Sequence, residues 1–429
     1  MKEVLAQSPV LPRNTRITRK KDKFLFLDPD KPSWVVTNAN GAAALHLCNG
    51  SRTVGDICRI MSIKMGRDKT PEVSEFFSHL FLEKHFFSDS EPYHYAGANL
   101  QAVHLNLTGK CNLRCIYCYA GDRDPSQDAL SRNDWFNVIE SVNRIGSRPT
   151  IELTGGEPLL VPYALDLAAF ARQRGNRVHL LTNGLPVDKE KAGAVKELVD
   201  LVRISLDGST SAIHDYHRGA GSFAAASRAV DHLLSTGAPV QISMTVTKKN
   251  LHDIPAMVAR FGSLVSFAPL FRTERARRHR SLWITGREYY RALVSVPGLN
   301  PLNCLYSCLQ QASSARIVKC SIGDGEISIS NTGDVYPCHL LHRPEFLAGN
   351  IKDEPLESIY HNSGTLQELR RLNVDRIEGC SACDLRYLCG GACRARAFYE
   401  KDRLDVADDF CAYEKLAFTE GLFALHSMD

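Results

Sequence analysis

Cysteine placement is the feature of this sequence that most directly indicates chemistry. The chain has 429 residues and 14 cysteines, and none of them lies between residues 119 and 303. Three lie between residues 111 and 118, and nine lie between residues 304 and 411. In a reducing compartment disulfides are disfavoured, so clustered cysteines indicate metal binding. The distribution therefore predicts two separate metal regions on one chain.

The first region is a CxxxCxxC loop formed by Cys111, Cys115 and Cys118. Three closely spaced thiolates can bind three irons of a four-iron cubane and leave the fourth iron without a protein ligand. An open iron can bind a small molecule, as a catalytic zinc ion does at its free position. A structural zinc site would need a fourth ligand, and strand alternation does not guarantee that the nearby His104 faces this loop. We therefore favour an iron–sulfur cluster over zinc.

The second region has the spacing Cys-x12-Gly-x4-Cys, then Cys-x2-Cys-x5-Cys-x3-Cys, and a last cysteine. Its cysteines are Cys320, Cys338, Cys380, Cys383, Cys389, Cys393 and Cys411. A zinc ribbon is the alternative, because CxxC pairs are common in zinc sites. Seven cysteines after a first cluster favour iron–sulfur. Cys304 and Cys308 lie just upstream, and each could be a ligand or an ordinary buried thiol.

The elements between these regions alternate between strand and helix. Strands are expected at 103–107, 150–153, 178–181, 201–206, 240–246 and 264–268, and helices at 132–145, 163–174, 189–199, 223–235 and 253–261. Six such units predict a parallel sheet with crossover helices that closes into a partial barrel. The cysteine loop, Gly155-Gly156-Glu157, Thr182-Asn183 and Asp207 all follow strands. Chemistry in such folds lies at these carboxyl ends.

The first ninety residues have a different pattern. Strands are expected at 15–18, 24–27 and 34–37, followed by helices at 38–47, 54–65 and 71–84, as in a small winged-helix-like unit. Residues 91–97 read as a linker, and the chain from residue 272 onward reads as loop-rich. We therefore predict domains at 1–97, 98–271 and 320–429, with a linker region at 272–319.

The composition limits the classes of partner. The net charge of +4 is small for this length, so binding to nucleic acid is not expected. A secretory signal and an apolar stretch of roughly 18 residues are both lacking, which disfavours a membrane protein. We expect a cytoplasmic protein.

The octet from Cys111 to Cys118, with Tyr117 just before the third cysteine, resembles the motif of the radical S-adenosylmethionine (SAM) superfamily. The resemblance implies that these three cysteines are catalytic and hold a [4Fe–4S] cluster whose open iron binds SAM. An electron from that cluster would cleave SAM to a 5′-deoxyadenosyl radical, which abstracts hydrogen from the substrate.

The resemblance also implies contacts to SAM. The residues that it assigns are Tyr117, Gly155, Gly156, Glu157, Thr182, Ser205 and Arg218. The Gly-Gly-Glu turn would receive the amino group, because glycines let the backbone approach a ligand closely. Ser205 would contact the ribose or carboxylate, and Arg218 would pair with the carboxylate. A surface salt bridge is the alternative for Arg218, and a simple turn or cap role is the alternative for Thr182.

The second cysteine region resembles the SPASM domain, the auxiliary-cluster extension of many radical SAM enzymes. By this resemblance, auxiliary cluster I takes Cys320, Cys338 and Cys393, and auxiliary cluster II takes Cys380, Cys383, Cys389 and Cys411. The chain would then bind SAM and three [4Fe–4S] clusters. Residues 321–330 contain no cysteine. Cluster I could therefore have an open iron, or could recruit Cys304 or Cys308.

The N-terminal region resembles the small peptide-recognition domain related to the pyrroloquinoline quinone peptide chaperone. That likeness rests on Phe24-Leu25-Phe26-Leu27, Asn49-Gly50 and Thr53-Val54. It implies that the leader of a ribosomally made precursor peptide binds as an added strand. A generic winged-helix unit used for packing or nucleic acid is the alternative. The three likenesses together imply an α/β fold with a partial (β/α)6 TIM-like radical SAM barrel between a winged-helix-like α+β domain and a cysteine-rich SPASM domain.

The function implied is that of a radical SAM maturase, which installs a crosslink or another change in a precursor peptide. Flavodoxin or ferredoxin would be a suitable electron donor. Alternatives are a maturase that oxidises a protein residue, as in sulfatase maturation, and a small-molecule radical SAM dehydrogenase. A redox-sensing iron–sulfur protein that binds nucleic acid is the non-enzyme alternative. Asp207 and Glu326 are acidic residues in suitable places, but the sequence gives no reason to make either one a general base.

Overall fold

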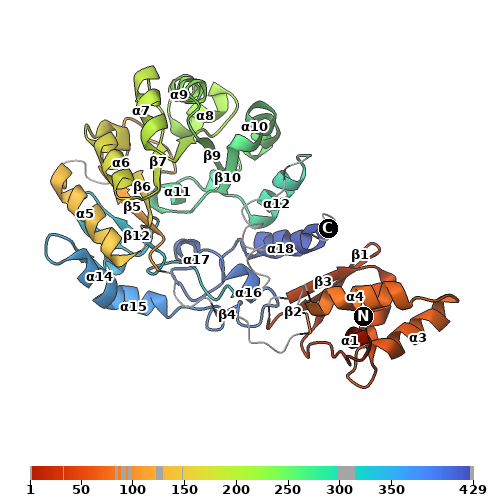
Figure 1. Ribbon diagram of the computed structural model, residues 1–429. Helices are drawn as coiled ribbons and strands as arrows, with labels where there is room; N and C mark the ends of the chain where they lie inside the picture. Colours follow the sequence, from red (N-terminus) through yellow and green to blue (C-terminus); the bar gives the residue numbers. More distant parts are fainter. Residues whose placement is uncertain are drawn as a thin grey trace.

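The computed structural model describes residues 2–31, 33–82, 86–87, 93–94, 99–121, 129–146, 148–297, 299 and 315–425. The described chain has an N-terminal domain, a half-open barrel and a cysteine-rich C-terminal region (Figure 1). The predicted linker at 91–97 is described only at Tyr93 and His94. Cys304 and Cys308 lie outside the described residues. Among the described helices, none is both long and apolar enough to cross a membrane.

The N-terminal domain is a three-stranded antiparallel sheet packed against helices. Its strands, in the order β1-β2-β3, are β1 (Arg16–Lys20), β2 (Lys23–Asp28) and β3 (Ser33–Thr37). The helices are α1 (Lys2–Leu5), α2 (Ala39–His46), α3 (Val54–Met65) and α4 (Thr70–Leu82). The three predicted strands and three predicted helices are confirmed, whereas α1 was not predicted. The winged-helix likeness stays a prediction.

Local chemistry explains why these helices form where they do. Thr53 and Asp56 make a reciprocal capping box at the start of α3, and Gly66 ends that helix in the left-handed conformation. Phe26, Val35 and Phe77 lie in one buried cluster between the sheet and the helices. Burial of these large apolar side chains holds the helices on one face of the sheet.

Six parallel strands form the barrel. They are β5 (Ala102–Asn106), β6 (Thr150–Thr154), β7 (Val178–Thr182), β8 (Leu201–Ser205), β9 (Val240–Val246) and β10 (Val265–Pro269). The crossover helices on the outside are α5 (Arg132–Ile145), α6 (Ala164–Gln173), α7 (Lys189–Leu198), α9 (Ser222–Thr236) and α10 (Ile254–Phe261). All six predicted units are confirmed. A further helix, α8 (Ser211–Arg218), was not predicted.

The barrel sheet continues into the C-terminal region. β12 (Glu326–Ile329) pairs in parallel with β5, and β13 (Asp334–Tyr336) and β14 (Gly349–Asn350) follow in antiparallel pairing. The sheet order is β10-β9-β8-β7-β6-β5-β12-β13-β14. The predicted domain limit at residue 320 therefore separates two parts of one sheet.

The region after residue 272, predicted to be loop-rich, contains several helices. They are α11 (Glu274–Arg277), α12 (Gly286–Val294), α14 (Leu356–Asn362), α15 (Gly364–Arg370), α16 (Arg386–Cys389), α17 (Arg394–Lys401) and α18 (Cys411–Leu425). Most have nine residues or fewer, so each offers too few turns for a clear helical periodicity. A short parallel pair also joins β4 (Tyr93–His94) to β11 (Ala315–Arg316).

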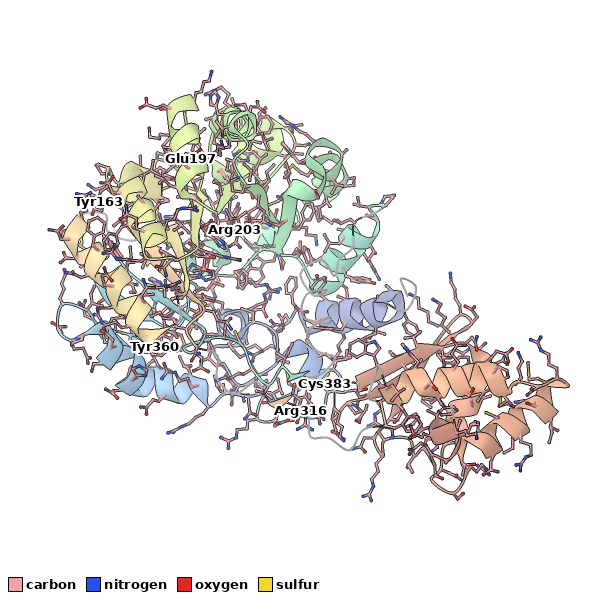
Figure 2. All side chains as sticks on the ribbon, viewed as in Figure 1. Tyr163, Glu197, Arg203, Arg316, Tyr360 and Cys383 are labelled. Carbon is pink, nitrogen blue, oxygen red and sulfur yellow. The ribbon has the colours of Figure 1, made fainter. Side chains whose placement is uncertain are left out.

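The second face of the N-terminal sheet packs on this C-terminal region. Leu25, Leu27 and Val36 of the sheet share a buried cluster with Leu388 of α16 and with α18. Two ion pairs flank the cluster: Arg386 Nη2 lies 2.7 Å from Asp30, and Arg16 Nε lies 3.0 Å from Asp384. Figure 2 shows Arg316 and Cys383 where the two regions meet.

Candidate active site

The CxxxCxxC loop lies directly after β5, at the carboxyl end of the barrel. Its three cysteines line a cavity of about 220 Å³ that also reaches the ends of β6, β7, β8 and β9. Cys111 is exposed, and Cys115 and Cys118 are half-buried. The three thiols lie close enough to one another that a charge on one would raise the pKa of another. Three converging thiols beside a cavity fit a four-iron cluster with one iron open to a ligand.

The Gly-Gly-Glu turn packs against the segment just before the cysteine loop and forms hydrogen bonds with it. The Gly156 N–H donates to Thr108 O at 2.7 Å, and the Glu157 N–H donates to Lys110 O at 2.9 Å. A Cβ atom on Gly156 would lie only 2.1 Å from Lys110 O, and Gly155 has a φ of +129°. Gly156 is therefore required for the close approach of the turn to Lys110, and Gly155 is required for its positive-φ backbone conformation. The N–H groups of residues 156 and 157 donate hydrogen bonds within the protein. The turn would therefore bind a ligand through its backbone carbonyl oxygens, which accept hydrogen bonds.

Glu157 lies behind the cavity wall and is fully buried. Its carboxylate accepts hydrogen bonds from Thr182 Oγ1 at 2.8 Å and from the Asn183 N–H at 2.7 Å. Burial raises the pKa of Glu157 to about 7 against the effect of these donors. Glu157 is not among the described residues that line the cavity. Its side chain joins the Gly-Gly-Glu turn to the end of β7, and a SAM contact by this residue stays a prediction.

Arg218 lies at the end of α8, where its guanidinium pairs with the fully buried Asp207. Tyr117 donates its hydroxyl to the same carboxylate. Burial raises the pKa of Asp207, but the adjacent Arg218 outweighs burial and leaves that pKa below its usual value. Arg218 Nη1 also lies 3.9 Å from Cys115 Sγ. The cation thus faces both a carboxylate and a cluster cysteine, and its predicted pairing with SAM stays a prediction.

Six of the seven predicted SAM residues line the cavity. They are Tyr117, Gly155, Gly156, Thr182, Ser205 and Arg218. The cavity is also lined by Arg203, Ser243 and Thr245, which were not predicted. Strand alternation could have found them, because Arg203 shares a strand face with Ser205. Figure 2 shows Arg203 inside the barrel half of the molecule.

Two further side chains hold the cysteine loop. Asn183 Nδ2 lies 3.7 Å from Cys111 Sγ and 2.7 Å from Asn112 Oδ1. Arg275 donates to Cys115 O at 3.2 Å and to Gly121 O at 3.1 Å. Arg275 comes from α11, outside the barrel, and its spacing from the cysteines gave no signal in the sequence.

The C-terminal cysteines form two separate groups. Cys320, Cys338 and Cys393 lie around one hydrophobic cluster and influence one another electrostatically. Burial raises the pKa of Cys393 to about 12. A buried thiol becomes a ligand when a metal ion compensates the thiolate charge, so this group suits a metal cluster.

The second group contains Cys380, Cys383, Cys389 and Cys411. Cys380 lies near both Cys383 and Cys411, and Cys389 lies near Cys380. Burial raises the pKa of Cys380, Cys389 and Cys411. The structure therefore brings together the two sets that the sequence predicted, while the assignment of each cysteine as a ligand stays a prediction.

Family models match both the barrel and part of the cysteine-rich C-terminal region. The radical SAM superfamily matches residues 105–261, and the SPASM iron–sulfur cluster-binding domain matches residues 320–384. The first family implies SAM and a [4Fe–4S] cluster. The second implies auxiliary iron–sulfur clusters.

Whole-chain relatives agree with these matches. The chain is similar to mycofactocin maturase MftC of Mycobacterium ulcerans, with 30% identity over 71% of this chain and 86% of the relative. It is also similar to the AdoMet-dependent heme synthase of Methanosarcina barkeri, with 29% identity over 72% of this chain and 95% of the relative. Streptococcus suis SuiB bound to its precursor peptide SuiA has the same fold, with a TM-score of 0.58 and 13% identity over 94% of this chain and 99% of SuiB. The chain therefore belongs to the radical SAM superfamily and is a radical SAM iron–sulfur enzyme with a SPASM domain.

Proposed function

We propose that this enzyme is a maturase that modifies a ribosomally made precursor peptide. MftC is named as a maturase, and SuiB was solved with a precursor peptide. When bound to its cluster, SAM supplies a radical that abstracts hydrogen from the peptide. The chain's own residues position the loop, enclose the cavity and hold the peptide.

The observation that carries this proposal is a groove in the N-terminal domain. The groove has a volume of about 270 Å³ and runs between β3 and the helices α2, α3 and α4. It is lined by Thr37, Asn38, Asn40, Gly41, Ala44, Met61, Met65, Lys69, Glu72, Val73 and Phe76. Methionine and phenylalanine offer adaptable apolar contacts, and Lys69 and Glu72 add a charged rim. Such a groove suits the apolar side chains of a leader peptide.

We also assign the cysteine groups to clusters. Cys111, Cys115 and Cys118 would hold the catalytic cluster, and the two C-terminal groups would hold auxiliary clusters I and II, giving three [4Fe–4S] clusters. Flavodoxin or ferredoxin would reduce the catalytic cluster. The auxiliary clusters would accept an electron from the product radical.

A tetrapyrrole substrate is the second candidate. It is favoured by the likeness to the AdoMet-dependent heme synthase, whose length this chain matches over 95%. A planar iron porphyrin would need no leader, so the groove of the N-terminal domain would have no part in its binding.

The test compares two substitutions on helix α3 in anaerobically reconstituted enzyme. Met65 lines the groove, whereas Ile63 is 77% exposed on the same helix and is not among the described groove residues. We expect Met65→Glu to weaken binding of the precursor peptide about tenfold, because about 1.4 kcal/mol of apolar contact is lost. Ile63→Glu should bind normally. SAM cleavage without peptide should be equal in both variants.

Substrates distinguish the two candidates. Peptides encoded beside the gene and an iron porphyrin are each tested for modification by mass spectrometry and for stimulated release of 5′-deoxyadenosine. Modification of a peptide supports the maturase. Turnover of the porphyrin alone, with equal rates in both α3 variants, would contradict it.

A further inference from the structure

A second cluster of metal-ligand types contains no cysteine and lies beside Cys338. It consists of His104 in β5, Glu326 in β12 and His339, which follows Cys338. Glu326 Oε1 lies 3.1 Å from His104 Nε2 and 2.8 Å from His339 Nδ1. The three donor atoms lie within 4.8 Å of one another. Two imidazoles and one carboxylate thus converge between the barrel and the SPASM region.

The other ring nitrogen of His104 provides independent support. His104 is 6% exposed, and its Nδ1 lies 3.1 Å from Glu152 Oε2. Within the described chain this buried nitrogen makes no well-aligned hydrogen bond. A histidine that binds a metal commonly directs its second nitrogen at a carboxylate, which fixes the ring and raises its basicity. Glu152 is placed to do this.

The two carboxylates that flank His104 have different partners. Glu152 also pairs with Arg203 at 3.3 Å and with His179 at 3.1 Å. Among the described residues, Glu326 forms ion pairs only with His104 and His339. Glu326 is therefore held by two imidazoles, and two histidines with one carboxylate are a donor set found in zinc sites.

We propose that His104, Glu326 and His339 bind a divalent transition-metal ion of the zinc class. Nitrogen and carboxylate donors suit Zn²⁺ or Fe²⁺. Tetrahedral ligands about 2.0–2.1 Å from zinc lie roughly 3.3 Å apart, so Glu326 Oε1 needs to move only slightly away from each of the two imidazole nitrogens. The ion would join β5 to β12, and its fourth position would be open to water or substrate.

The site is distinct from the cysteine sites by its donor atoms. Cys338 Sγ lies 3.9 Å from His339 Nδ1, so the two kinds of site are neighbours. The ring of His339 also contacts the ring of Tyr119, which lines the SAM cavity, with 5.8 Å between centroids. A metal here would therefore lie beside the cavity. The inference is independent of the proposed function, because metal is counted without turnover.

The test is zinc binding to the reconstituted, cluster-loaded enzyme. After incubation with Zn²⁺ and desalting, zinc per chain is counted and X-ray absorption is recorded at the zinc edge, where iron does not interfere. We expect about one zinc per chain with nitrogen and oxygen neighbours at about 2.0–2.1 Å. Sulfur neighbours at about 2.3 Å would show zinc on the cysteines and overturn the proposal. Absence of bound zinc would overturn it too.

Variants locate the site. Glu326→Gln should lose the zinc, and Glu152→Gln should weaken its binding about tenfold through His104. His342→Gln is the matched control, because His342 bonds Ser328 of β12 at 2.7 Å and lies outside the cluster. Iron content should be equal in all variants, which shows that they fold and load clusters. Equal zinc in wild type and Glu326→Gln would overturn the assignment.

Discussion

Gly156→Ala is the change that most sharply tests how the cysteine loop is supported. The added Cβ would lie 2.1 Å from Lys110 O and 2.6 Å from Lys110 C, directly before Cys111. Ordinary contacts of this kind begin at about 3.3 Å, so the carbonyl must move by about 1.2 Å. Both neighbours are backbone atoms, so no side-chain rotation can relieve the clash.

The magnitude follows from that displacement. A shift of about 1 Å at reacting groups can cost about 100-fold in rate, which corresponds to about 2.7 kcal/mol. The hydrogen bond from the Glu157 N–H to Lys110 O at 2.9 Å would also be disturbed. Overpacking adds about 1–3 kcal/mol of destabilisation. We therefore expect reductive SAM cleavage to fall about 100-fold and the denaturation midpoint to fall.

Gly193→Ala is the matched control. Gly193 lies inside α7, and a Cβ there would meet no atom within 4 Å. This change should leave SAM cleavage unaltered and stabilise the helix by about 0.5–1 kcal/mol. The assay measures 5′-deoxyadenosine formed per iron bound under dithionite. Cleavage by Gly156→Ala within threefold of wild type would show that the loop does not depend on this contact.

Three further outcomes are expected. Asp207→Asn should destabilise the fold by about 3–5 kcal/mol, since it leaves Arg218 as an unpaired, largely buried cation, and Asp207→Asn/Arg218→Met should recover part of the loss in denaturation experiments. The pKa of Glu157 is raised from 4.5 to about 7. Its contribution to the free energy of unfolding is therefore full below about pH 4.5 and is lost as the pH rises through 7. Glu157→Gln should flatten this pH dependence of the free energy of unfolding. Cys380→Ala should lower bound iron by about four per chain and leave reductive SAM cleavage intact, because it removes a ligand of one separate cluster. Loss of SAM cleavage in Cys380→Ala would show that the cluster bound by Cys380 and the SAM-binding cluster are not independent.

Short-range spacing accounts for what could be predicted from the sequence. The CxxxCxxC loop places three thiols on one turn, and Ser131 begins the predicted helix at α5 with a capping box to Asp134. Ser205, which the resemblance to the radical SAM superfamily assigned, lines the cavity at the carboxyl end of β8. These signals are local, so a single sequence contains them.

Contacts between distant segments account for what could not be predicted. Arg275 reaches the cysteine loop from α11, and its partners are backbone carbonyls that any residue type supplies. His104 and Glu326 meet only because β12 pairs with β5, more than 200 residues away in the chain. Neither pairing leaves a periodic or spacing signal. α8 was missed because it is short and its buried residues are His214 and His217, so it shows no apolar periodicity.

The packing of the N-terminal sheet limits where the proposed leader peptide would bind. One face of the sheet is covered by α2, α3 and α4, and the other is covered by α16 and α18. An added strand must therefore pair at an edge. The β1 edge is exposed along its length, but the groove adjoins β3 through Thr37. Only at β3 can a peptide both extend the sheet and place apolar side chains in the groove, so β3 is the edge that the proposed function requires.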